Sequence, residues 1–281
     1  MEFVPALAET AVTASTASDA VPLFTEPILS EETVAEYLGE DWAFVYRNRE
    51  YLLWGTVVTI ALTITSLLLG FLAGFPAGVI EAYGGGYSRA FVRKFGVLLR
   101  GTPILVIMIY TFYVLPIGIV LDPVQSALAG LDAVLGPIPV PDVGEAFMAA
   151  TLALGFRSAA YQSQIFRGAL QNVDEGQMEA ARSIGMNRLE AIRHVIAPQA
   201  LRRSVPGFQN EFTIVLKDTS IAFAIGLGEL LKRSNDLFFQ QTTAILEVII
   251  FASLIYFVLT FSTNRTLDYV SNRFAIPGES S

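Results

Sequence analysis

The sequence predicts an all-α integral membrane protein with five membrane-spanning helices. Its 281 residues are 53% hydrophobic and only 16% charged, with a mean hydropathy of +0.53, whereas soluble domains carry about 25% charge. Three stretches contain no charge at all: residues 51–80, 101–121 and 248–264. A helix needs roughly 20 mostly apolar residues to cross a bilayer. The first two stretches are long enough, and the third becomes so once Ile245 and Leu246 are added.

The residue types that the sequence lacks, or has only once, exclude several classes of protein. The chain has no cysteine, which rules out disulfides, thiol nucleophiles and cysteine metal sites. His194 is the only histidine and is expected in a loop, so a histidine metal site or an acyl-transfer triad is not expected. Basic residues flank the apolar stretches and do not alternate with aromatic ones, so the sequence does not indicate nucleic-acid binding.

Residues 1–43 are expected to form an acidic tail outside the membrane. The first fifty residues contain ten acidic side chains against Arg47 and Arg49. No basic segment precedes an apolar one, so a secretory signal is not predicted, and residues 1 to about 30 are expected to be disordered. Aromatic residues then precede the first span and are expected at the level of the lipid headgroups: Trp42, Phe44, Tyr46 and Tyr51.

The distribution of basic residues orients the spans. We expect a transmembrane domain over residues 44–270, with spans at about 51–80, 96–120, 144–168, 208–230 and 243–264, and a cytoplasmic tail at 271–281. Arginine and lysine gather after the first, third and fifth spans, whereas the N-terminal tail and residues 121–142 contain few or none. Because positive loops stay in the cytoplasm, we expect a multi-pass protein of the cell membrane with its N-terminus outside and its C-terminus in the cytoplasm. Residues 121–142 are expected to form an external loop, with a re-entrant course left open.

The first span carries three glycines four residues apart. Gly70, Gly74 and Gly78 lie on one helix face, where a neighbouring backbone can approach closely; ordinary enrichment of glycine in membrane helices is the alternative explanation. Pro76 lies between them and should kink the helix, because it removes a backbone donor.

The third and fourth spans contain polar residues that cannot face lipid. Arg157, Tyr161 and Gln164 interrupt the third span, and Glu211, Lys217 and Asp218 interrupt the fourth. A charge at the bilayer centre costs at least about 2.5–3.5 kcal/mol on insertion scales. These side chains are therefore expected to line a pathway, with the alternative that Lys217 and Asp218 reach the membrane edge.

Residues 174–206 form a polar segment between two spans and are expected to fold as two short helices joined by a sharp corner. Asp174 is a suitable N-cap for a helix at about 175–184, and Gly185 can adopt the left-handed backbone that ends it. Asn187, followed three residues later by Glu190, resembles a capping box. Pro198 is expected to end the second helix. Such a segment indicates a docking site for another protein, and hence a transporter driven by a separate motor.

This segment resembles the EAA loop of ABC importer permeases. Three residues separate Glu179-Ala180-Ala181 from Gly185, and nine residues separate Gly185 from Val195-Ile196-Ala197-Pro198. The family usually has isoleucine and leucine where Val195 and Ala197 stand, but the spacing is kept.

Further motifs resemble the polar amino acid uptake subfamily over about residues 44–270. They are Arg100-Gly101-Thr102-Pro103, Ala160-Tyr161, Ile165-Phe166-Arg167-Gly168, Glu175-Gly176-Gln177, Pro198-Gln199-Ala200-Leu201-Arg202, Asn210-Glu211 and Leu216-Lys217-Asp218-Thr219-Ser220. Two features depart from the subfamily: Gln164 replaces an acidic residue, and the loop at 121–142 is longer. The first leaves the charge of the substrate open.

The resemblance implies a five-span type I ABC importer permease fold with cytoplasmic coupling helices. The chain would be a transport subunit and not an enzyme, with no cofactor of its own. ATP and Mg²⁺ would be bound by separate ATPase subunits, in keeping with the absence of a G-x-x-x-x-G-K-[ST] phosphate loop. Other implied partners are an extracytoplasmic solute-binding protein, a second permease (an identical copy or a paralogue) and the lipid bilayer. The residues expected at the ATPase are Glu179, Ala180, Ala181, Arg182, Gly185 and Pro198.

The substrate path is expected to lie between permease subunits near the membrane midplane. The residues expected to line it are Tyr161, Gln164, Glu211, Asp218, Thr219 and Ser220; the alternative is that they only hold helices together. Import of a polar amino acid is the favoured function. Import of an opine or another small zwitterion, an ion-driven secondary carrier and, least favoured, a membrane protease are the alternatives.

Overall fold

The computed structural model describes residues 30–135 and 144–274, and within these ranges the chain is helical without strands. The first part contains α1 (Glu31–Leu38), α2 (Glu40–Arg47), α3 (Arg49–Tyr83), α4 (Gly86–Gly101), α5 (Ile104–Val114) and α6 (Gly118–Leu135). The second part contains α7 (Glu145–Gln171), α8 (Glu175–Ser183), α9 (Arg188–Ala191), a π-turn (Ile192–Ile196), α10 (Ala197–Asp218), a 3₁₀ segment (Thr219–Ile225), α11 (Leu230–Gln240), a 3₁₀ turn (Thr242–Ala244) and α12 (Ile245–Phe274).

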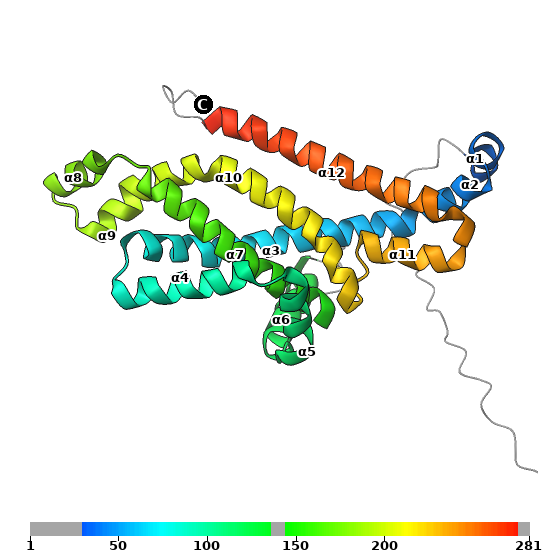
Figure 1. Ribbon diagram of the computed structural model, residues 1–281, viewed down its shortest axis with the longest axis horizontal. Helices are drawn as coiled ribbons and strands as arrows, with labels where there is room; N and C mark the ends of the chain where they lie inside the picture. The colour runs from blue at the N-terminus through cyan, green and yellow to red at the C-terminus, as the bar shows by residue number, and fades with distance from the viewer. Residues whose placement is uncertain (1–29, 136–143, 275–281) are drawn as a thin grey trace, which may run out of the picture.

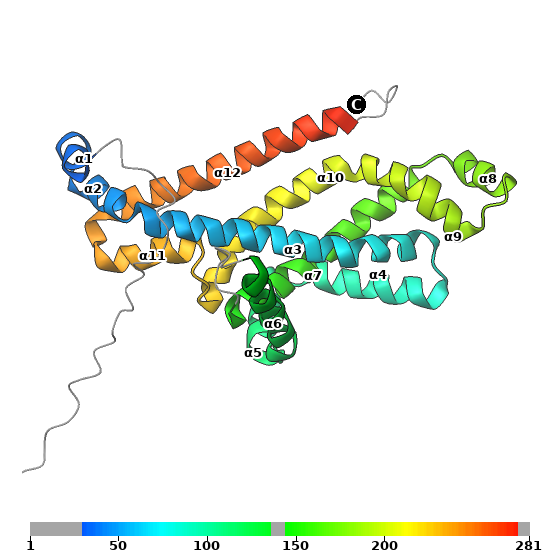
Figure 2. The same ribbon diagram turned by 180° about the vertical axis from the view of Figure 1, so that it is seen from behind.

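The molecule is elongated, and its two ends are built from different elements (Figure 1). Helices α1, α2 and α11 lie at one end, and α8 and α9 lie at the other, as the view from behind confirms (Figure 2). Between them α3, α7, α10 and α12 run along the long axis, while α5 and α6 project sideways. The first 29 residues, including most of the expected acidic tail, lie outside the described residues.

Within the described ranges, two helices are long and apolar enough to cross a membrane by themselves: Arg49–Tyr83 and Thr242–Tyr269. They coincide with the first and fifth expected spans. In α7 and α10, which hold the third span and the first part of the fourth, the polar residues described above lower the hydropathy, and neither passes the same test.

The segment expected as one span at about 96–120 is divided. Helices α4 and α5 pass the hydropathy test only together, and they meet at an angle of 104°. The break lies at Thr102, whose backbone is extended (φ −97°, ψ 131°) and which precedes Pro103. Proline disfavours the helical conformation in the residue before it and has no amide hydrogen to donate, so the helix ends here.

The fourth expected span also has different bounds. Helix α10 begins at Ala197 and ends at Asp218. The chain continues as a 3₁₀ segment that ends at Gly226, which has φ +80°. The prediction that Pro198 ends a helix was wrong, because the backbone stays helical through the π segment (Ile192–Ile196), which ends just before Pro198, and on into α10. Residues 121–142 were expected as a loop, but α6 continues as a helix to Leu135; residues 136–143 lie outside the described residues.

The glycine face of α3 packs directly on α7, as predicted. A Cβ atom on Gly70 would lie 2.5 Å from the amide nitrogen of Gln162, one on Gly74 would lie 2.8 Å from the carbonyl oxygen of Ala159, and one on Gly78 would lie 2.7 Å from Cβ of Phe166. The backbones therefore approach as closely as they do only because these side chains are absent. Pro76 lies within α3, which remains a single helix from Arg49 to Tyr83.

Candidate functional site

The corner after α8 is formed by backbone chemistry that the sequence encodes. Oδ1 of Asp174 accepts a hydrogen bond from the amide of Gly176 at 2.7 Å and so caps α8. Gly185 then takes φ +93°, and the amide of Met186 donates to the carbonyl of Ala181 at 3.2 Å. This 6→1 bond around a left-handed glycine is the Schellman arrangement.

The helix after the corner begins with the predicted capping box. The amide of Glu190 donates to Oδ1 of Asn187 at 3.0 Å, and the amide of Asn187 donates to Oε2 of Glu190 at 2.9 Å. Two of the otherwise unpaired amides at the start of a helix are satisfied in this way. The expected helix–corner–helix is therefore present, with a fixed angle at Gly185.

A small apolar cluster attaches this corner to the rest of the protein. Its buried members are Ala169, Leu170, Val173, Ile196 and Ala200, and Tyr83 and Met178 pack against them. The guanidinium of Arg188 lies 5.7 Å from the ring centre of Tyr83. The ends of α3 and α7 thus contact α8, α9 and the start of α10 directly.

The residues expected at the partner differ in their exposure. Glu179, Ala180, Arg182, Gly185 and Pro198 are exposed, whereas Ala181 is buried. Ala181 therefore packs α8 on the protein. Glu179 and Arg182 also line an open hollow between α8 and the end of α3.

Two exposed apolar side chains of the corner were not identified from the sequence as contact residues. Ile184 is 74% exposed and Leu189 is 73% exposed. The spacing of Leu189 from Ile192 is typical of the apolar face of a helix and predicts that Leu189 packs inward. The structure turns it outward beside Gly185, so the corner presents an apolar surface next to charged Glu179 and Arg182.

A second group of polar residues lies between α7 and α10. Arg157, near the middle of α7, forms an ion pair with Asp218 at the end of α10, and its guanidinium lies 5.2 Å from the ring centre of Tyr161. At the next residue of α7, the hydroxyl of Ser158 donates to Oε1 of Glu211 at 2.7 Å. Tyr161, Glu211 and Asp218 are therefore gathered around Arg157, which the sequence identified as a polar interruption but not as a site residue.

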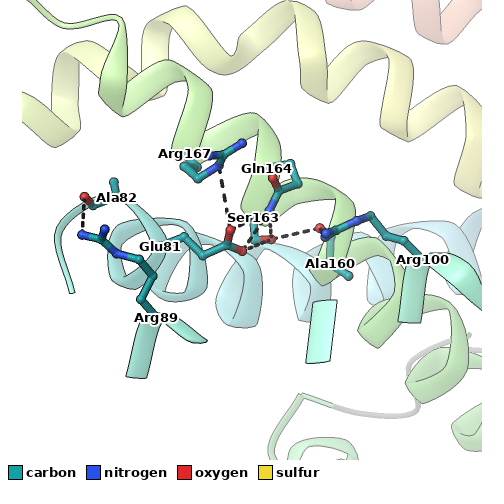
Figure 3. Close-up of polar contacts among 8 residues, drawn as sticks. All are labelled: Glu81, Ala82, Arg89, Arg100, Ala160, Ser163, Gln164 and Arg167. Carbon is teal, nitrogen blue, oxygen red and sulfur yellow. Dashed lines mark hydrogen bonds and ion pairs between the residues drawn. The ribbon is translucent and has the colours of Figure 1, made fainter. Parts of the chain in front are cut away.

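Gln164 belongs to a third group, which joins α7 to α3 and α4 (Figure 3). Its amide nitrogen donates to both carboxylate oxygens of Glu81, at 2.8 and 2.9 Å, and the hydroxyl of Ser163 donates to the same carboxylate at 3.3 Å. Nε of Arg167 lies 3.8 Å from that carboxylate, and Arg100 of α4 donates to the carbonyl of Ala160. Where the family resemblance led us to expect an acid at position 164, the structure places a carboxylate from the facing helix.

Thr219 and Ser220 contribute little to these groups. The hydroxyl of Thr219 donates to the carbonyl of Leu216 at 2.6 Å, and that of Ser220 donates to the carbonyl of Lys217 at 2.8 Å. Both hydroxyls therefore satisfy carbonyls at the end of α10. Among the described residues, no group of three acidic or histidine side chains is arranged to hold a metal ion.

Comparisons with known proteins agree with this architecture. Residues 66–276 match the family described as "Binding-protein-dependent transport system inner membrane component". The chain is 30% identical to the glutamine transport system permease protein GlnP of Escherichia coli K12, over 84% of this chain and 98% of GlnP. It is 26% identical to the glutamate/aspartate import permease protein GltK of E. coli O6:H1, with the same two coverages. It is 30% identical to the nopaline transport system permease protein NocM of Agrobacterium fabrum, over 74% of this chain and 80% of NocM.

Two solved structures have a similar fold. One is a chain from a crystal structure of an amino acid ABC transporter with histidines, with a TM-score of 0.66 and 29% identity over 83% of this chain and 99% of that one. The other is a chain from the methionine ABC transporter MetNI in an inward-facing conformation, with a TM-score of 0.60 over 80% of this chain and 97% of that one. At 18% identity, the second comparison concerns the fold alone.

Proposed function

Because the chain belongs to the family of binding-protein-dependent transport system inner membrane components, we propose that it is the membrane-spanning subunit of an ATP-driven importer of polar amino acids. Family membership makes it a transport subunit and an inner membrane component. The cargo is supported by the relatives, whose names include permeases for glutamine, for glutamate and aspartate, and for histidine, lysine, arginine and ornithine.

The observation that carries the proposed coupling is the exposed corner at one end of the molecule. Its backbone is fixed by two caps and a left-handed glycine, and the apolar cluster joins it to α3 and α7. A surface that presents Glu179 and Arg182 beside exposed Ile184 and Leu189 suits a protein partner, because charged groups align the partner and apolar groups provide affinity. The partner we propose is a separate ATPase, which binds ATP and Mg²⁺ and supplies the energy of hydrolysis.

The rest of the assembly follows from this role. A solute-binding protein would deliver the cargo at the end of the molecule that contains α1, α2 and α11, and a second permease, identical or paralogous, would complete the path. The orientation is the one given by the basic residues, with the corner in the cytoplasm. Closure of the ATPases would move two such corners and change the side of the membrane to which the path is open.

Reversing one charge of the corner tests the docking surface. Glu179→Lys, in the permease reconstituted with its cognate ATPase and binding protein, should lower cargo-stimulated ATP hydrolysis by about tenfold, the loss expected from one interface contact worth about 1.4 kcal/mol. Glu175→Lys is the matched control, because Glu175 is exposed on the same helix and is not among the residues expected at the ATPase. Equal stimulation in wild type and Glu179→Lys would contradict the docking assignment.

An opine is the second candidate cargo, supported by the similarity to the nopaline permease NocM. Nopaline and the polar amino acids both carry an ammonium beside a carboxylate, so both fit the description of a small zwitterion. Screening the twenty amino acids and nopaline for stimulation of ATP hydrolysis by the reconstituted complex separates the two. Uptake by the permease without any ATPase would contradict both.

A further inference from the structure

The ion pair between Arg157 and Asp218 is open to its surroundings. The side chain of Arg157 is 20% exposed and that of Asp218 is 22% exposed. Complete burial of two charges costs desolvation free energy, and this pair avoids part of that cost because each side chain keeps some exposure. The two charges can therefore be reached by a small molecule lying beside both helices.

Arg157 also has hydrogen-bonding capacity that the described residues do not use. A guanidinium carries five N–H donors, and Nε of Arg157 is buried with no acceptor among those residues. The ring of Tyr161 lies against the guanidinium, at 5.2 Å from its centre. Arg157 is thus positioned by Asp218 and Tyr161 while donors remain for a second acceptor.

A second carboxyl group lies beside the pair. Glu211 is 4% exposed, is held by the hydroxyl of Ser158 at 2.7 Å, and is close enough to both Arg157 and Asp218 to interact with them electrostatically. Lys217, next to Asp218 in the chain, is exposed and is not among the groups that act on Glu211. Two carboxyl groups therefore face a single guanidinium.

A molecule that opens this pair has to replace both charges together. Removing one partner of a partly buried pair leaves the other uncompensated in a poorly solvated place, which is strongly unfavourable. An anion alone would leave Asp218 without a cation, and a cation alone would leave Arg157 without an anion. An α-amino acid carries a carboxylate for Arg157 and an ammonium for Asp218, so the number of opposite-charge contacts does not fall when the pair opens.

We propose that Arg157 and Asp218 form an exchangeable ion pair that a zwitterionic cargo opens, and that Glu211 makes this place unfavourable for cargo with an additional carboxylate. The inference rests on the proposed import of amino acids and narrows the cargo by charge. Neutral and cationic amino acids are accepted here, and glutamate and aspartate are disfavoured. Arg157 is then a binding residue, and Glu211 is a specificity-determining one.

The test measures binding to the permease itself, because a solute-binding protein would impose its own selectivity. The detergent-purified complex of permease and ATPase, without binding protein, is incubated with radiolabelled glutamine, lysine or glutamate, and bound label is measured at equilibrium. The wild-type complex should bind glutamine and lysine more tightly than glutamate. Asp218→Asn removes one negative charge beside Arg157, which lessens the repulsion of a second carboxylate, and should shift the glutamate-to-glutamine affinity ratio toward glutamate by about tenfold, within the usual range of such couplings.

A second variant and a control keep the test decisive. If Asp218→Asn does not assemble, Glu211→Gln keeps the ion pair intact and should shift the ratio in the same direction. Asp268→Asn, which removes an acid that contacts Gln209 from α12, should leave the ratio unchanged. A wild-type ratio in both Asp218→Asn and Glu211→Gln would overturn the inference alone, whereas a wild-type complex that bound none of the three amino acids, and was not stimulated by any in the screen, would overturn the proposed function as well.

Discussion

Single residues decide how closely the two central helices approach. A Cβ atom on Gly74 would lie 2.8 Å from the backbone oxygen of Ala159, and a backbone atom cannot move aside as the end of a flexible side chain can. Gly74→Ala should therefore lower the stability of the purified protein by about 1–3 kcal/mol, the usual cost of overpacking. A thermal melt in detergent measures the change.

Gly168 provides the control for this substitution. It lies in α7, and a Cβ atom added there would meet nothing within 4 Å. Gly168→Ala should leave the melting temperature unchanged or raise it, because alanine favours a helix by roughly 0.5–1 kcal/mol over glycine. Equal losses in the two variants would mean that close packing of α3 on α7 does not limit stability.

The hydrogen bonds from Gln164 to the carboxylate of Glu81 can be tested by exchanging the two side chains. Gln164→Glu would place two carboxylates within hydrogen-bonding distance, without the amide that donates to Glu81 at 2.8 and 2.9 Å, and should destabilise the protein or reduce its yield. Adding Glu81→Gln restores one carboxylate and one amide with their positions exchanged. The double variant should recover most of the loss in a thermal melt, as coupled neighbours do; additive losses would show that the two side chains do not interact.

At the scale of single residues, the sequence best predicted the interactions between residues that are close together in the chain. The caps at Asp174 and Asn187 and the left-handed Gly185 depend on residues within a few positions of one another, and all three were predicted. The partners of Arg157 and Glu81 are 61 and 83 residues away in the chain, and no local pattern specifies which helix faces which. Both residues were visible as charges beside or within apolar stretches, but their contacts were not predictable.

Among the elements, the corner at Gly185 is the one we expect to be most sensitive to substitution. Its φ of +93° is unfavourable for other residues, although nothing lies within 4 Å of an added Cβ. Gly185→Val should therefore act through backbone strain, with a cost of about 1–3 kcal/mol, while Gly185→Asn should cost less, because asparagine tolerates this region. Hydrogen exchange at the amides of residues 186–191 should be faster in the valine variant than in the asparagine variant, and equal rates would exclude strain as the cause.

Element boundaries were less predictable than element types. The hydropathy of residues 96–120 is continuous, so it could not reveal the 104° bend that follows from Thr102 and Pro103. Pro198 was interpreted as an end because proline often follows a helix, whereas here the helix continues through it, with a π segment just before it. Proline marks a local irregularity, and the sequence alone does not say whether the helix ends there or continues.

For the whole molecule, the orientation in the membrane is the property to measure. The chain has no cysteine, so single cysteines can be introduced without removing any. Gly130→Cys, in α6, should react with an impermeant maleimide added outside intact cells, and Arg188→Cys, in the corner, should react only after the membrane is opened. Labelling of the two positions in the opposite order would reverse the proposed topology.

The length of α3 has a consequence for the motor protein. Its 35 residues extend about 52 Å at 1.5 Å per residue, whereas the hydrocarbon layer is about 30 Å thick. Since the last turn of α3 ends in the apolar cluster with α7 and α8, a helix of this length that runs steeply through the bilayer can hold its point of attachment beyond the hydrocarbon layer. An ATPase seated there would need no affinity for phospholipid and could remain a freely diffusing cytosolic protein until it assembles.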